Sequence, residues 1–84
     1  MNVDVYARPE AGNKLSYLIV PAGKPIPHEA ENIEWQLRKS GVHIDETAEL
    51  VHPYEIHHAR EQMAEKGYAI TSLADQVPAG SASV

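Results

Sequence analysis

The 84 residues leave room for one domain, and the absence of cysteine excludes disulfides and thiolate metal sites. A formal charge of −5, from 12 acidic and 7 basic residues, opposes binding to nucleic acid and to anionic membranes. No apolar run approaches the ~20 residues of a membrane-spanning helix, and no signal peptide is visible. We therefore expect a cytoplasmic protein that binds neither nucleic acid nor membrane.

The first residues predict an antiparallel hairpin. Residues 3–8 alternate between apolar and polar side chains, which is typical of a half-buried strand. Residues 9–13 form a turn cluster, in which Gly12 and Asn13 both tolerate positive φ. Residues 15–20 are apolar on nearly both faces, so we place this second strand inside the sheet.

Beyond a proline-rich loop, residues 32–45 are compatible with either a helix or a strand. The helical interpretation gives an apolar stripe that ends at Gly41 but leaves Trp35 outside it. The strand interpretation directs Trp35 towards the core, where a large aromatic ring is better placed. We favour one helical turn near residues 27–31 and then a strand, with a bulge or turn at Ser40-Gly41.

Residues 53–67 predict the main helix. Pro53 suits the first helical position, where a missing N–H costs nothing. Apolar residues recur at i, i+3 and i+7 from Ile56, and Gly67 is placed to end the helix in a left-handed conformation. The β-branched and aromatic residues of 68–71 then predict a further strand.

These elements predict an α+β fold, a small and mainly antiparallel sheet of about four strands with the helix 53–67 packed on one face. Residues 1–73 are expected to form a single compact domain. The remaining residues, 74–84, are small and polar, and we interpret them as a disordered tail.

The order of these elements resembles the YcgL-type domain, a small bacterial α/β domain, and a group of short proteobacterial proteins of unknown function. The resemblance spans roughly residues 3–72. The stretches that carry it are Val5-Tyr6, Tyr17-Leu-Ile-Val20, Ile44-Asp45, Leu50-Val51 and Ala64-Glu-Lys-Gly-Tyr-Ala-Ile70. The resemblance implies a mixed sheet with helices on one face and supplies no catalytic residues. The Ser40-Gly41 break and the polar tail depart from the YcgL type.

The five histidines are the one unusual enrichment in the composition, and they suggest a divalent-metal site. On the predicted helix, His57 and His58 are four and three residues before Glu61, and His52 is close enough to supply a third ligand. A solvated helix face explains the same pattern. Adjacent helical residues point about 100° apart, so only one of the two histidines can join Glu61. We therefore predict no specific metal site and no cofactor.

No nucleophile motif or phosphate loop is present, so no catalytic residue is assigned. Trp35 near Arg38 and Lys39 is a candidate recognition spot, because tryptophan and arginine recur at interfaces, although a core position is the commoner role for tryptophan. We predict a non-enzymatic interaction or regulatory module, whose partner is another protein or a second copy of the chain. The alternative is an accessory protein or enzyme with a His/Glu metal site. A free sheet edge would favour the first, and a cluster of histidines and carboxylates the second.

Overall fold

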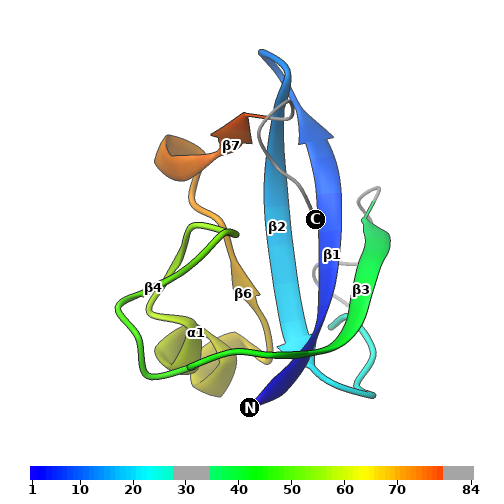
Figure 1. Ribbon diagram of the computed structural model, residues 1–84, viewed down its shortest axis with the longest axis vertical. Coiled ribbons are helices and arrows are strands. Elements are labelled where there is room, and N and C mark those ends of the chain that lie inside the picture. Colours follow the sequence, from blue (N-terminus) through cyan, green and yellow to red (C-terminus); the bar gives the residue numbers. More distant parts are fainter. Residues whose placement is uncertain (28–34, 79–84) are drawn as a thin grey trace.

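A computed structural model describes residues 1–27 and 35–78 (Figure 1). The described part is an α+β fold, with an antiparallel sheet, a separate two-stranded hairpin and one α-helix. The elements in chain order are β1 (Asn2–Glu10), β2 (Lys14–Pro21), β3 (Gln36–His43), β4 (Leu50–Val51), β5 (Ile56–His57), α1 (Ala59–Lys66), β6 (Ala69–Ile70), the 3-10 helix η2 (Leu73–Asp75) and β7 (Val77–Pro78).

The predicted hairpin is confirmed as β1 and β2. The two strands pair antiparallel from Val3 opposite Pro21 to Glu10 opposite Lys14. Gly12 and Asn13 in the connecting turn have φ of 75° and 58°. Both residue types reach this left-handed region at low cost, which is why the chain can reverse here so tightly.

β2 is the inner strand that its apolar sequence predicted. The strand order is β3-β1-β2-β6, and β7 also pairs with β2. β6 lies opposite Leu18 and Ile19, whereas β7 lies opposite Lys14 and Leu15. The two short strands thus follow one another along the same side of β2, and β3 forms the opposite edge of the sheet (Figure 1).

β3 confirms the strand interpretation, and it is bulged. Its pairing with β1 shifts register twice, between Val3 and Val5 and again between Val5 and Tyr6. Gly41, in the first of these bulges, has a φ of 66°. The predicted bulge at Ser40-Gly41 is therefore present. The predicted helical turn near residues 27–31 lies largely within 28–34, outside the described residues.

One carboxylate fixes this bulge to the neighbouring loop. The backbone N–H of Gly41 donates to Oδ1 of Asp4 at 3.0 Å, and that of Gly23 donates to Oδ2 at 3.1 Å. Asp4 lies in the middle strand β1, so its side chain holds together the edge strand and the loop that follows β2. A backbone N–H that has no acceptor in the ladder at a bulge can donate to a side chain in this way.

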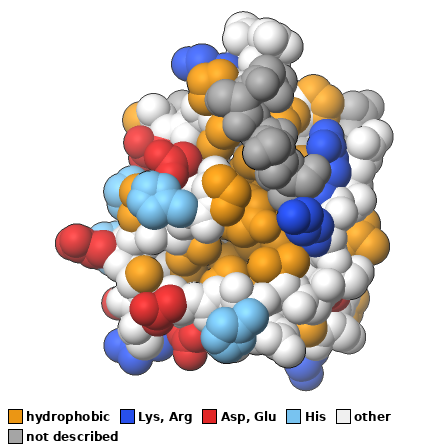
Figure 2. Space-filling view, in the orientation of Figure 1, with side chains coloured by type: hydrophobic (Ala, Val, Ile, Leu, Met, Phe, Trp, Pro, Cys, Tyr) orange, Lys and Arg blue, Asp and Glu red, His pale blue; other side chains and the backbone are white. Residues whose placement is uncertain are grey.

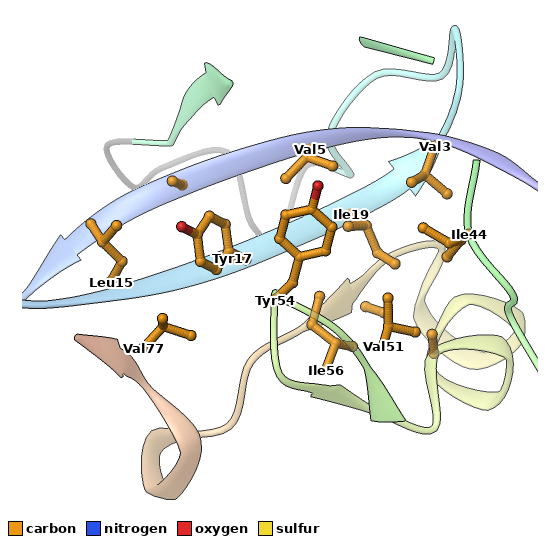
Figure 3. Packing of buried hydrophobic residues seen from close by; sticks show 13 residues of the cluster. Val3, Val5, Leu15, Tyr17, Ile19, Ile44, Val51, Tyr54, Ile56 and Val77 are labelled. Carbon is orange, nitrogen blue, oxygen red and sulfur yellow. The ribbon is translucent and has the colours of Figure 1, made fainter. Parts of the chain in front are cut away.

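The main core lies between one face of the sheet and the layer formed by the β4–β5 hairpin and α1 (Figure 3). Tyr17 and Tyr54 meet edge to face at its centre, with ring centroids 5.1 Å apart. The side chains in this core are mainly aliphatic and come from every strand except β3, to which only the partly buried Val42 belongs. A smaller cluster covers the other face, where Leu18 and Val20 pack against Tyr6, Ile26, Trp35 and Tyr68.

The predicted start of the helix at Pro53 is wrong, because α1 begins only at Ala59. Pro53 lies in the turn between β4 and β5, after a cis peptide bond. Glu55 and His58 have φ of 55° and 52°, values that no α-helix contains. The predicted end is confirmed, since Gly67 has a φ of 86° and its N–H donates to the Met63 carbonyl at 2.9 Å.

The predicted start of the tail at residue 74 also needs correction. Val77 is only 7% exposed, belongs to the main core and pairs with Leu15 through β7. The ordered part of the chain therefore runs to at least Pro78. A two-residue strand leaves no periodic signal in the sequence, so only its contact with β2 identifies it.

Candidate functional site

The outer edge of β3 is the least covered part of the described sheet. Within residues 1–27 and 35–78, β3 pairs with β1 alone. Every residue of the strand is exposed except Val42, which is half-buried. Leu37 is 54% exposed and is one of two large hydrophobic side chains on the described surface, the other being Met1. An exposed edge that presents a bare leucine is a ready place for another chain to bind.

The register gives this edge two chemically different faces. Side chains directly opposite each other on paired strands point to the same side of the sheet. Leu37 is opposite Tyr6, whose side chain belongs to the smaller apolar cluster. Lys39 is opposite Val5, which belongs to the main core. An apolar group and a cation are thus presented on opposite faces of the same short edge.

Trp35 extends the apolar face. It is half-buried against the smaller cluster, so the predicted core role accounts for part of its surface. The guanidinium carbon of Arg8 lies 4.6 Å from the centre of its ring, which is a cation–π contact. Arg8 also donates to Glu10 at 2.8 Å, so its position over the indole is fixed from both sides. The indole Nε1 is buried without a hydrogen-bond partner among the described residues.

Arg38 and Lys39 give the edge its positive charge. Neither side chain forms an ion pair with a carboxylate of the described residues. Burial raises the pKa of the Tyr17 hydroxyl, and the nearby charge of Arg38 partly offsets that rise. Arg38 is therefore close to the main core face as well as exposed at the edge. Among the described residues, no carboxylate competes with an external anion for these two cations.

Charge is divided between the two sides of the molecule. In residues 45–75, seven carboxylates accompany the two cations Arg60 and Lys66. On β1, the described carboxylates are both engaged: Asp4 accepts two backbone N–H groups, and Glu10 pairs with Arg8. In Figure 2, acidic side chains gather mainly on the hairpin side, whereas basic side chains lie on the β3 side and also at the upper and lower edges of the view. The β3 edge is thus a basic region on a chain of formal charge −5.

The metal-site candidates are placed in separate pairs. His52 Nδ1 lies 2.8 Å from Glu55, and His57 Nε2 lies 3.4 Å from Asp75. His57 and His58 precede the helix instead of lying on it, so their predicted helical spacing to Glu61 does not exist. In the part of the chain that the structure describes, no three His, Asp or Glu residues gather closely enough to hold a metal ion.

The surface hollows do not add an arrangement suited to catalysis. One of about 460 Å³ is lined by His52, Glu55 and Asp75 among others. Oδ2 of Asp75 already accepts from Ser72 at 2.6 Å and lies beside His57. A second hollow, of about 310 Å³, is mainly apolar and is lined by both methionines of the chain. Neither contains a nucleophile next to a base, the minimum for covalent catalysis.

The sequence predicted Trp35, Arg38 and Lys39 but not Leu37 and Arg8. Leu37 fits the apolar alternation of a strand, and only the strand order shows that it lies at an open edge. A local signal did exist, because Arg38-Lys39 is the only pair of adjacent basic residues in the chain.

Comparison with known proteins adds a family but no activity. Residues 1–77 match the model of a family described as "Family of unknown function (DUF6139)". No curated protein and no solved structure matches the chain. Of the described helices, none has the length and apolar character needed to cross a bilayer.

Proposed function

The chain belongs to the DUF6139 family of unknown function, and we propose that it is a small, non-enzymatic interaction module that binds another protein through the β3 edge. The observation that carries this proposal is the open edge itself. β3 has one neighbour among the described strands, and it presents Leu37 at 54% exposure. Beside it are the two cations Arg38 and Lys39, which form no ion pair with a described carboxylate. Exposed edges of this kind bind partners by adding a strand, with pockets or charges providing the selectivity.

The alternative with a His/Glu metal site has less support, because His52 and His57 are paired with carboxylates in separate places. The expected location of the module is the cytoplasm, with which its cysteine-free sequence is compatible. The likeness to YcgL-type domains stays a prediction, since the matched family does not name that type.

Site-specific photo-cross-linking in cells tests the proposed surface. A photoreactive amino acid is placed at Leu37 in one variant and at Glu65, an exposed residue of α1, in a matched control. We expect a discrete covalent adduct from position 37 and none from position 65. Equal adducts at both positions, or none at position 37, would show that the β3 edge is not the contact surface.

A further inference from the structure

We propose that the partner of the β3 edge is an extended acidic segment, with apolar and carboxylate side chains in alternation, which adds to the sheet beside Gln36–Lys39. This inference rests on the proposed function and specifies its partner class. An added strand places its own side chains on alternate faces. Its apolar residues would lie next to Leu37 and Trp35, and its carboxylates next to Arg38 and Lys39.

The bulges limit the length of the added strand. The positive φ of Gly41 and the hydrogen bond from its N–H to Asp4 interrupt the edge beyond Lys39. About four residues, Gln36 to Lys39, remain available, which corresponds to roughly 13 Å of strand. The second register shift falls within them, between Leu37 and Lys39, so the available stretch is itself bulged. The occupant is therefore a short peptide segment and not the full-length strand of a second sheet.

Charge complementarity selects an acidic occupant. Bulges and basic side chains are features by which proteins keep exposed edges from pairing with one another. Two copies of β3 side by side would bring Arg38 and Lys39 of each copy together, and like charges in adjacent strands are destabilising. The same cations attract a carboxylate-bearing strand, and they have no carboxylate partner among the described residues.

The test uses two synthetic peptides and three forms of the full chain. The acidic peptide is acetyl-Gly-Val-Glu-Val-Glu-Val-Gly-amide, and in its basic counterpart lysine replaces both glutamates. Each is titrated into the isotopically labelled protein, and binding is followed by amide NMR shifts. The forms are the wild type, Arg38→Glu/Lys39→Glu and the control Lys14→Glu/Lys24→Glu. Both double variants change the net charge equally, and Lys14 and Lys24 are exposed and lie outside β3.

We expect the acidic peptide to shift the amides of residues 35–39 in the wild type and to bind more tightly than the basic peptide. Reversing Arg38 and Lys39 should weaken acidic-peptide binding about tenfold and invert the preference, whereas the control should keep the wild-type order. Inversion is a readout that damage to the fold would not produce, because a misfolded edge would bind neither peptide.

Equal binding of both peptides, shifts outside the β3 edge, or an unchanged preference in the reversed variant would overturn the inference. So would a wild-type dimer in sedimentation that the reversal of Arg38 and Lys39 dissociates, since the partner would then be a second copy. A position-37 cross-link together with failure of the acidic peptide would remove only the acidic partner. Absence of both signals would remove the proposed function as well.

Discussion

At the scale of single residues, the most unusual group is the Tyr17 hydroxyl. Tyr17 is fully buried, yet its hydroxyl has no hydrogen-bond partner among the described residues. A buried polar group left unpaired costs about 1–3 kcal/mol relative to a satisfied one. The ring itself fills the centre of the core against Tyr54, so the cost comes from one oxygen atom.

Replacing Tyr17 by Phe should therefore stabilise the protein. We expect the free energy of unfolding to rise by about 1 kcal/mol, because the ring stays and only the unpaired hydroxyl is removed. Urea titration measures the change, and Tyr6→Phe, at a half-buried tyrosine, serves as the control. A Tyr17→Phe variant that is less stable than the wild type would show that the hydroxyl has a partner in solution.

The pH dependence of this substitution has a definite sign. Burial raises the pKa of both Tyr17 and Tyr54, so the unfolded chain ionises its tyrosines first as pH rises. The stability linked to these phenols is complete below a pH of about 10 and is lost above it. Tyr17→Phe should make the alkaline loss of stability shallower than in the wild type.

At the scale of elements, the two-residue strand β7 contributes both to the main core and to the sheet. It contributes Val77 to the main core and pairs with the beginning of β2. It also follows η2, whose Asp75 lies beside His57 of β5. The end of the described chain thus contacts both the sheet, through β7, and the β4–β5 hairpin, through Asp75.

Two truncations that differ only in β7 should have different stabilities. The free energy of unfolding should be about 2 kcal/mol lower for a chain ending at Gln76 than for one ending at Pro78, because the shorter chain lacks the buried Val77 side chain. In a domain of this size, that difference corresponds to roughly 8–16 °C in melting temperature. Equal melting temperatures for the two truncated chains would show that residues 77–78 do not contribute to the stability of the domain.

The elements also show what sequence patterns can and cannot predict. Period-two alternation was sufficient for β1 and β2, and Gly67 was sufficient for the end of α1, because each depends on local chemistry. For β3, alternation left helix and strand open, and the placement of Trp35 favoured the strand. Proline is equally compatible with a helix start and with a turn, so Pro53 does not distinguish the two. Glu55 and His58 have positive φ although neither is glycine, so the sequence does not indicate where the chain turns. The candidate edge was only partly predictable, because strand order follows from long-range packing.

At the scale of the whole molecule, carboxylates predominate in residues 45–75, whereas β3 carries the adjacent cations Arg38 and Lys39. His52 and His57 lie beside carboxylates of the acidic segment, and His43 lies in β3. Each imidazole–carboxylate pair is separate, so a divalent ion would find at most two side-chain ligands at either place. This arrangement suits solubility and the steering of a charged partner. It is poorly suited to a metal centre, which usually takes three or four protein ligands.

Zinc should accordingly leave the melting temperature of the full chain unchanged. A ligand stabilises a protein only when it binds the folded form more tightly than the unfolded form, and isolated surface pairs provide little such preference. Differential scanning fluorimetry with and without zinc measures the effect. A rise of several degrees at micromolar zinc that Glu61→Ala abolishes would instead support the metal-site alternative.

The strand order β3-β1-β2 also has a consequence during synthesis of the chain. The β1–β2 hairpin spans residues 2–21 and can form from neighbouring segments as soon as it leaves the ribosome. The strand that covers β1, residues 36–43, is translated later. Until then the outer side of β1 is itself a bare edge, with the apolar Val3, Val5 and Ala7 along it and without the cations that β3 brings. A nascent chain that stalls in this interval exposes a strand far more prone to unwanted pairing than the finished protein does.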